Sequence, residues 1–507
     1  MYRHIRTLIL LIIIPALCYS ITLERINHPY LYNRGSGAGF RCITPLENGQ
    51  FLIGGLFSSP RNNELDFYFW LGESSLDLDS VYYQRHYGSS GCFQYANKIV
   101  ISSNGNLALF GEFQQEDHEI CNYRITAMSL DEDRDSLWYN CYGELHHSCH
   151  FVDAIKRNDD DGYIIISHRQ DDLYNRWNYI ELYSIDTDGN LEDIVNYGDD
   201  DIHDDDEYGY DPRGIINLED EGYLVYGKYV ALDRGYVSRG FIMRINNDFN
   251  IEWSTTIIDS IRGEAAQNGY FRCATPSVNG GFLLAGGTDL GRTSNYHDKH
   301  WIVKVDDEGD VQWERVYVDY FGDRDNWFKH IFETEDGNIL AFGKSESLDP
   351  RYESPCIMLA DEDGDVIEEY IVEEYYSTDY FRDVAAINND EYVAIRPAGT
   401  TIIKINLGQG SVADNLTTTC KSFKLYPAYP NPFNTQARFV YSLPYSTSYS
   451  LYLYDHAGRF VRSMSSGYGV AGVHHGWLDA GSLPSGSYYI RLLTPDGSVT
   501  SPIVITK

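Results

Sequence analysis

The sequence predicts an all-β protein: a seven-bladed β-propeller closed by the N-terminal strand, followed by a small Ig-like β-sandwich. Three observations predict this fold. A turn-and-strand segment recurs seven times within the 507 residues, further short strands surround the copies, and the repeat stops after residue 407. Four short antiparallel strands in a unit of ~50 residues are typical of a propeller blade.

The recurring segment is a polar turn followed by a short apolar strand, as in NGQFLIGG, GGFLLAGG and DGNILAFG. Successive copies begin their strands 56, 56, 60, 59, 57 and 53 residues apart. This regularity predicts seven units. Their first strand residues are Phe51, Leu107, Tyr163, Tyr223, Phe282, Ile339 and Tyr392.

Each unit contains three further strands, which residues 271–276, 301–305 and 311–317 illustrate. A tight acidic turn, such as DDEGD from Asp306, joins the last two strands. Asp and Gly supply the backbone conformations that hairpins require. These turns lack the length and the terminal Glu of an EF-hand, so we interpret them as hairpin turns rather than calcium loops.

The two ends of the repeat region complement each other. The last unit has a third strand at 401–405, but no fourth strand follows it, whereas an unassigned strand at 21–26 resembles the fourth strand at 311–316. We therefore expect the N-terminal strand to complete the seventh unit. Such pairing removes free sheet edges and ties the ends of the ring together.

The long, irregular connections fall between strands two and three and between units, which places them on one face of the predicted propeller. Examples are residues 57–64, 112–119, 287–299 and 344–354. Loops gathered on one face of a scaffold are common binding surfaces. Aromatic residues in this region are candidates for stacking on sugars: Tyr174, Trp177, Tyr296 and Trp327.

The first 20 residues have the pattern of a secretory signal peptide, with Arg3 and Arg6 before the apolar run 8–17 and small or polar residues after it. The run is shorter than a spanning helix requires. With 75 acidic and 39 basic residues, the formal net charge is −36. A field of this sign repels nucleic acid, which excludes it as a partner.

Eight of the nine cysteines follow the predicted signal peptide, and none has the C-x-x-C spacing of a zinc site. Export permits disulfides. Cys121 and Cys141 flank one predicted hairpin, which leaves a disulfide between them open. Cys42 and Cys273 occupy matching positions, within FRC in both cases, and we interpret them as small core residues.

No catalytic or cofactor-binding motif stands out in the sequence. An acidic run at 199–207 contains the weak calcium candidates Asp204, Asp205 and Asp206, since clustered carboxylates suit hard cations. A solvated run of charge is the alternative. We therefore predict no cofactor and favour a protein that is not an enzyme.

The repeat gives way to a small, polar stretch at 408–422, which we interpret as a linker. About seven short strands follow within 423–507, and this number in ~85 residues is typical of an immunoglobulin-like sandwich. The predicted domains are thus a signal peptide (1–20), a propeller (21–407), a linker (408–422) and a sandwich (423–507).

Two resemblances extend these predictions. Residues 21–407, with repeats such as GGFLLAGGT…WIVKVDDEGDVQWERVY, resemble secreted bacterial propeller proteins. Residues 423–507, with YPNPFN, LYDHAGRFV and LPSGSYYIRL, resemble the C-terminal sorting domain of type IX secretion cargo and the related FlgD-like sandwich. The residues that carry the sorting motif are Pro430, Asn431, Pro432, Phe433, Asn434, Gly458 and Gly486.

The second resemblance implies contact with the outer-membrane secretion machinery and a secreted or cell-surface location. For the propeller, the sequence favours a module that binds an extracellular glycan or protein ligand. Two alternatives stay open. One is a secreted carbohydrate-active hydrolase or lyase with acidic residues that converge at the central channel, and the other is a structural or adhesive surface protein.

Overall fold

A computed structural model describes residues 18–507 apart from several short gaps. The gaps are 28–31, 34–35, 62–63, 75–80, 89–92, 118–119, 144–147, 160–161, 171–177, 199–207, 219–221, 232–236, 259–267, 290–297, 318–324, 349–350, 373–379, 397–400, 411–423, 426–432, 444–446, 470–471, 482 and 496. The chain divides into two compact units: Ile21–Leu407, and a second that contains Gly408–Lys507.

The first unit has an all-β, propeller-like fold, and its described strands form seven sheets that we number along the chain. Sheet 1 contains β2 (Tyr32–Asn33), β3 (Ser36–Pro45), β4 (Phe51–Arg61), β5 (Glu64–Ser74) and β6 (Val81–Tyr87). Sheet 2 contains β7 (Phe93–Ile101), β8 (Leu107–Asp117), β9 (Ile120–Leu130) and β10 (Ser136–Tyr142). Sheet 3 contains β11 (Ser148–Lys156), β12 (Gly162–Gln170), β13 (Asn178–Asp186) and β14 (Leu191–Tyr197).

The remaining sheets repeat this arrangement. Sheet 4 contains β15 (Tyr208–Asn217), β16 (Tyr223–Ala231), β17 (Val237–Ile245) and β18 (Ile251–Ile257). Sheet 5 contains β19 (Gly269–Pro276), β20 (Phe282–Asp289), β21 (Asp298–Val305) and β22 (Val311–Tyr317). Sheet 6 contains β23 (Trp327–Glu333), β24 (Ile339–Leu348), β25 (Arg351–Ala360) and β26 (Val366–Ile371). Sheet 7 contains β27 (Asp383–Ala386), β28 (Glu391–Ile395), β29 (Thr401–Gly410) and β1 (Cys18–Asn27), in that order across the sheet.

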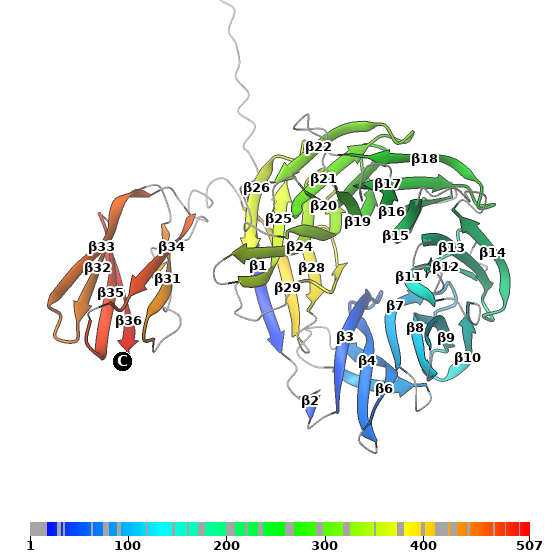
Figure 1. The fold of residues 1–507 in the computed structure, drawn as a ribbon, viewed down its shortest axis with the longest axis horizontal. Helices are drawn as coiled ribbons and strands as arrows, with labels where there is room; N and C mark the ends of the chain where they lie inside the picture. The colour runs from blue at the N-terminus through cyan, green and yellow to red at the C-terminus, as the bar shows by residue number, and fades with distance from the viewer. Residues whose placement is uncertain are drawn as a thin grey trace, which may run out of the picture. The chain divides into compact units, whose positions relative to one another are not determined.

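The sheets pack face to face around a central opening, and β3, β7, β11, β15 and β19 lie nearest to it in Figure 1. We call these strands, together with β23 and β27 at the same end of their sheets, the inner strands. Apolar side chains of neighbouring sheets share hydrophobic clusters, as expected for strands covered on both faces. Sheets 1 and 7 also share one, in which Phe40 and Trp70 pack with Val393 and Ile402. The first and last sheets of the repeat are therefore neighbours.

A β-bulge in each inner strand explains the glycines that end the repeated apolar segment. In five sheets a glycine of the second strand lies so close to the inner strand that a Cβ would meet a backbone oxygen at 1.8–2.3 Å. These glycines are Gly55, Gly111, Gly227, Gly286 and Gly343. Sheet 3 instead has Ser167, whose hydroxyl donates to Glu181 (3.3 Å).

We expect Gly343→Ala to destabilise the propeller by about 3 kcal/mol, at the upper end of typical overpacking costs. The new Cβ would lie 2.1 Å from the Trp327 carbonyl oxygen, in a strand that is paired on both sides. Urea unfolding would measure the change. Gly39→Ala is the matched control, because its Cβ would contact only the Leu56 side chain, at 3.4 Å. Equal stability of the two variants would contradict the explanation.

The acidic turns are hairpin turns, as predicted. The carboxylate of the first Asp accepts hydrogen bonds from backbone amides. Asp306 Oδ1 accepts from the N–H groups of Glu308 (3.2 Å) and Asp310 (2.8 Å). The fourth turn residue has a positive φ, such as +86° at Gly309, a conformation that Gly adopts without steric cost.

Tyrosine hydroxyls connect these turns to the preceding sheet. In four places the last tyrosine of an outer strand donates to the carbonyl oxygen of the positive-φ residue in the next sheet, at 2.8–2.9 Å. The pairs are Tyr87–Arg134, Tyr142–Gly189, Tyr197–Phe249 and Tyr317–Gly364. Part of the high tyrosine content therefore serves contacts between sheets.

The cysteine predictions have mixed outcomes. Cys42 and Cys273 are buried core residues, as expected. The disulfide between Cys121 and Cys141, which the sequence left open, is not formed, since Cys141 is a free thiol. Cys141 lies opposite Thr126, five residues along β9 from Cys121, and at ~3.4 Å per residue this offset exceeds the reach of a disulfide.

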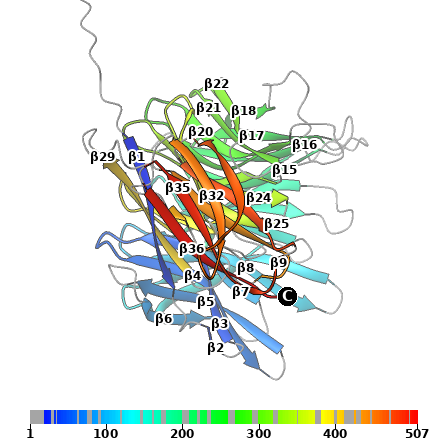
Figure 2. The same cartoon turned by 90° about the vertical axis from the view of Figure 1, so that its left-hand side faces the viewer.

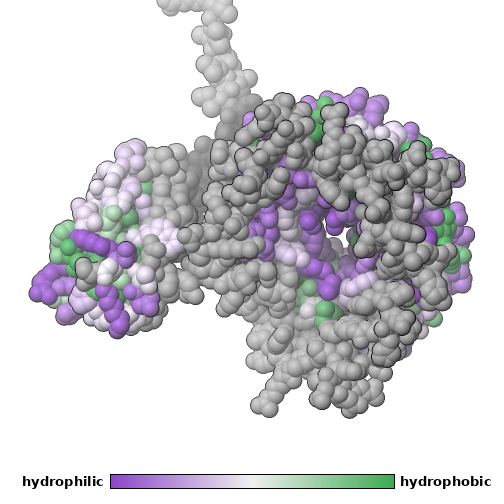
Figure 3. All heavy atoms as spheres, viewed as in Figure 1, coloured by the Kyte–Doolittle hydropathy of each residue, from purple (hydrophilic) through white to green (hydrophobic). Residues whose placement is uncertain are grey.

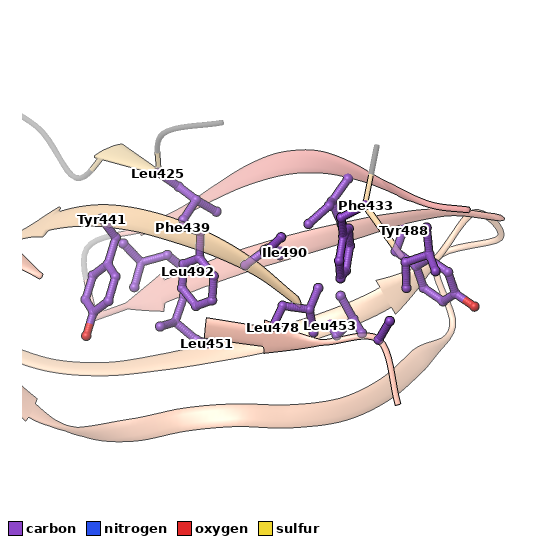
Figure 4. Packing of buried hydrophobic residues seen from close by; sticks show 14 of the residues in the cluster. Leu425, Phe433, Phe439, Tyr441, Leu451, Leu453, Leu478, Tyr488, Ile490 and Leu492 are labelled. Carbon is purple, nitrogen blue, oxygen red and sulfur yellow. The ribbon is translucent and has the colours of Figure 1, made fainter. Parts of the chain in front are cut away.

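The second unit contains two sheets around one hydrophobic core. One sheet contains β30 (Lys424–Leu425), β31 (Gln436–Leu443) and β34 (Gly472–Asp479). The other contains β33 (Phe460–Gly469), β32 (Thr447–Asp455), β35 (Gly486–Thr494) and β36 (Gly497–Ile505), of which β32, β35 and β36 lie side by side in Figure 2. Figure 4 shows Phe439 and Leu478 from the first sheet packed with Leu453 and Ile490 from the second.

Candidate functional site

The inner strands of the seven sheets share one local pattern near the central opening. In sheets 1 to 6 a register shift inserts an extra residue into the inner strand. In sheet 7, Arg382 N–H donates to the Ile395 carbonyl (2.7 Å), and Asp383 also pairs with Ile395. Two residues therefore lie opposite one residue of the neighbouring strand, as in the other sheets. Bulges of this kind redirect side chains.

Five of the seven residues at these positions are cations. We call the set the channel ring: Arg41, Asn97, Val152, Arg213, Arg272, Lys329 and Arg382. The preceding residue is buried in every sheet and is a phenylalanine in five of them, whereas each channel-ring residue is at least partly exposed. Hydrophilic residues accordingly surround the opening in Figure 3.

A second tier lies two residues before the channel ring. We call it the aromatic ring: Gly39, Tyr95, His150, Asp211, Tyr270, Trp327 and Tyr380. All seven residues are half-buried. The two residues lie on the same side of a strand, because side chains alternate between its two faces, so the two rings lie next to each other along the channel.

Cation–π contacts join the two rings across sheet boundaries. The Arg41 guanidinium lies 3.9 Å from the ring centroid of Tyr95, and that of Arg272 lies 4.2 Å from Trp327. Lys329 Nζ lies 5.4 Å from the ring of Tyr380. These distances are within the range of a favourable cation–π interaction.

Four cations from sheets 1, 5, 6 and 7 influence one another electrostatically. Burial lowers the pKa of Lys329 to about 7, and the charges of Arg382, Arg272 and Arg41 act in the same direction. Burial, followed by the charge of Arg382, also lowers the pKa of Arg41. Among the described residues none of the four forms an ion pair. We call Arg41, Arg272, Lys329 and Arg382 the cation cluster.

Two carboxylates next to the channel ring have partners within the protein. Asp153 Oδ1 forms an ion pair with Lys98 Nζ at 2.9 Å. Asp383 accepts hydrogen bonds from the backbone N–H groups of Ile43 (2.9 Å) and Val384 (3.0 Å). Burial nevertheless raises the pKa of Asp383. These roles are structural. Asp153 and Asp383 therefore do not support the alternative of a hydrolase whose acidic residues converge at the central channel.

A separate hollow lies between sheets 3 and 4, on the side of the acidic turns. Its lining includes Arg157, Asp159, Glu192 and Tyr223. Arg157 forms ion pairs with both Asp159 and Glu192. The charge of Arg157 is therefore balanced by ion pairs within the protein, whereas the cation cluster has no such pairs among the described residues.

The predicted site residues have different outcomes. Trp327 belongs to the aromatic ring, whereas the other stacking candidates, Tyr174, Trp177 and Tyr296, lie outside the described residues. The same holds for the calcium candidates Asp204, Asp205 and Asp206, and for Pro430, Asn431 and Pro432 of the sorting motif. The described part of the chain contains no group of three His, Cys, Asp or Glu residues suited to a metal.

The described residues of the sorting motif have structural positions in the second unit. Phe433 is buried, its N–H donates to Val504 O (3.0 Å), and its carbonyl accepts from Thr506 N–H (2.8 Å). Gly458 has a φ of +74° in a tight turn that begins at Asp455. Gly486 opens β35.

Sequence reasoning missed the channel ring. A signal was present: Phe-Arg or Phe-Lys recurs at 40–41, 271–272, 328–329 and 381–382. Within the two FRC segments we interpreted only the cysteines, as core residues, and did not single out the cations.

Comparison with known families identifies the C-terminal unit. Its residues 427–506 match the family model for the secretion system C-terminal sorting domain. The chain carries a sorting domain. This domain points to export by the type IX secretion system, and hence to a secreted or cell-surface protein that contacts the secretion machinery.

The propeller-like fold has distant counterparts among solved structures. The β-propeller domain of the Trilobed protease from Pyrococcus furiosus is 10% identical, with 76% of this chain and 98% of that chain covered and a TM-score of 0.39. Pyrococcus horikoshii acylaminoacyl peptidase is 10% identical, with 81% and 59% covered and a TM-score of 0.38. Penicillium chrysogenum α-L-arabinanase complexed with arabinobiose is 13% identical, with 63% of this chain and 93% of that chain covered and a TM-score of 0.35.

The 59% coverage means that this chain spans less than two thirds of the acylaminoacyl peptidase. No curated protein matches the sequence. Within the described residues, no helix is long and apolar enough to cross a membrane.

Proposed function

We propose that this protein is an exported propeller module that binds an extracellular glycan or protein ligand at its central channel. The observation that carries the proposal is the pairing of the aromatic ring with the channel ring. Rigid inner strands present both rings, and sites on such scaffolds are well ordered. Half-exposed aromatic faces beside cations offer both stacking and hydrogen-bonding surfaces to a ligand.

In this proposal the seven sheets are the blades of one propeller, and β1 closes the ring beside β29. The position of β1 in sheet 7 and the shared cluster of sheets 1 and 7 support the closure. We further propose that residues 1–20 are a signal peptide, that 21–407 form the propeller, and that 408–422 link it to a sandwich at 423–507 with the immunoglobulin-like arrangement. The division after Leu407 agrees with these boundaries.

Trp327→Ala is expected to weaken ligand binding at least tenfold, since stacking on an aromatic side chain and its pairing with Arg272 are lost together. The mature chain, residues 21–507, is screened on glycan and protein arrays, and dissociation constants are measured for the hits. Trp477→Ala is the matched control, because Trp477 is also exposed but lies in the sorting domain.

An absence of any ligand in both screens would overturn the proposed function. Unchanged binding by the Trp327 variant would place the ligand site elsewhere and would also count against the proposal. Concentration-dependent self-association without ligand binding would favour the structural or adhesive alternative.

A further inference from the structure

The cation cluster gathers four like charges that form no ion pair among the described residues, although Glu112, Asp298 and Asp383 act electrostatically on Arg41, Arg272 and Lys329. The chain as a whole carries −36, and buried cations elsewhere include one that lies against carboxylates. This cation, Lys344, lies 2.8 Å from Glu353 and 3.3 Å from Glu346. Enclosing unpaired like charges is unfavourable, so a concentration of such charges at one site indicates a function other than stability.

Resting on the proposed function, we propose that the channel ligand is an acidic glycan whose sugar carboxylates bind among the four residues of the cation cluster. The cluster supplies the charge that a carboxylate needs. Guanidinium groups match carboxylates in shape, because their N–H donors lie in one plane and pair with two oxygens at once.

Contacts within the channel hold the guanidinium groups in place but leave donors for a ligand. Arg272 lies between the rings of Tyr270 (5.1 Å) and Trp327 (4.2 Å). Arg382 Nη1 donates to the Tyr380 hydroxyl (3.0 Å), and Arg41 Nη1 donates to Asn97 Oδ1 (3.3 Å). A guanidinium has five N–H donors, so a single bond leaves the others for a carboxylate.

The aromatic ring favours a glycan over an acidic peptide. Tyr270 and Trp327 come from the inner strands β19 and β23, and Tyr380 lies just before β27; Trp327 and Tyr380 contact each other edge to face with centroids 5.4 Å apart. A chain of sugars presents apolar ring faces that stack on such side chains, whereas runs of Asp or Glu have no comparable face. Each residue of a uronic acid polymer offers both a ring face for stacking and a carboxylate for the cations.

The test uses the mature chain and oligogalacturonate, with the fully methyl-esterified oligomer as the uncharged ligand of the same length. We expect titration calorimetry to detect binding of oligogalacturonate. The methyl ester should bind at least tenfold more weakly. Affinity for the acid should also fall as salt rises, because exposed charge pairs are screened. This comparison needs no variant, so misfolding cannot produce it.

Arg272→Gln with Arg382→Gln is expected to lower the affinity for oligogalacturonate at least thirtyfold. Arg85→Gln is the matched control, because Arg85 lies outside both rings and pairs with Asp135 at 2.8 Å; it should change affinity less than threefold. Unfolding curves verify that all variants are folded. An equal loss in the control and the double variant would overturn the assignment to the cation cluster.

The remaining outcomes separate this inference from the proposed function. Equal binding of acid and ester would overturn the acidic-ligand inference while leaving a glycan-binding propeller. Binding of polyglutamate, but of no glycan, would assign the channel to acidic peptides and overturn the inference as well. If no ligand binds on the arrays or in the titrations, both the inference and the proposed function are overturned.

Discussion

Thr22→Pro combined with Glu24→Pro is expected to lower the stability of the propeller by several kcal/mol and to break its unfolding into more than one transition. Both residues lie in β1, which follows β29 across sheet 7. Proline cannot donate to a strand ladder and is restricted in strands, and each lost hydrogen bond costs about 1 kcal/mol.

The expected size of this effect exceeds the loss of individual hydrogen bonds because, in the proposed closure, β1 joins the two ends of the ring. Sheets 1 and 7 would then remain together only through side-chain packing, such as Phe40 against Ile402. Stepwise separation of neighbouring sheets becomes accessible, as in repeat arrays whose units interact only with their neighbours.

Urea unfolding followed by circular dichroism and by limited proteolysis measures the result. Thr22→Val with Glu24→Thr is the matched control, because both new residues suit a strand and retain the N–H groups. A single transition at the original midpoint in the proline variant would show that β1 does not close the ring. The convergence of Arg41 with Arg382 would then have to rest on packing alone.

The repeat architecture was predictable because its signals are local. Each apolar strand follows a turn whose Gly or Asp has a defined backbone role, and the turn at Asp306 has the predicted hairpin geometry. Spacing between copies adds information that no single strand contains. The sorting domain was predictable for a related reason, since several motifs recur in a fixed order along the chain.

The channel site was not predictable from the same signals. Whether Arg272 faces the core or the channel depends on a bulge between Phe271 and Cys273, and one inserted residue changes the side of every later side chain. The sequence pattern FRC contains no sign of that insertion. The disulfide between Cys121 and Cys141 stayed open in the sequence for the same reason, because deciding it required the register of β9 and β10.

Lys329→Met is expected to stabilise the propeller while it weakens binding of an acidic ligand. Burial and the cations Arg382, Arg272 and Arg41 lower the pKa of Lys329 to about 7, from an ordinary value of 10.5. Between these two values the unfolded chain binds more protons than the folded protein, so stability rises with pH across this window. Below pH 7 the full cost of the charge is present, and the methionine removes it.

The melting temperature of the variant should therefore exceed that of the unchanged protein at pH 6, and the difference should shrink towards pH 10.

Lys344→Met is the matched comparison, and we expect it to lower the stability of the propeller. Lys344 is 7% exposed and pairs with Glu346, which is 1% exposed, and removal of one partner from a buried ion pair costs about 3 kcal/mol or more. Two lysines fifteen residues apart in the chain thus differ in their partners: Lys344 pairs with carboxylates, whereas Lys329 Nζ donates to the Arg382 carbonyl oxygen and forms no ion pair among the described residues. Destabilisation by Lys329→Met at pH 6 would contradict the prediction that this charge is a net cost to the folded protein, and would count against the cation cluster as an anion site.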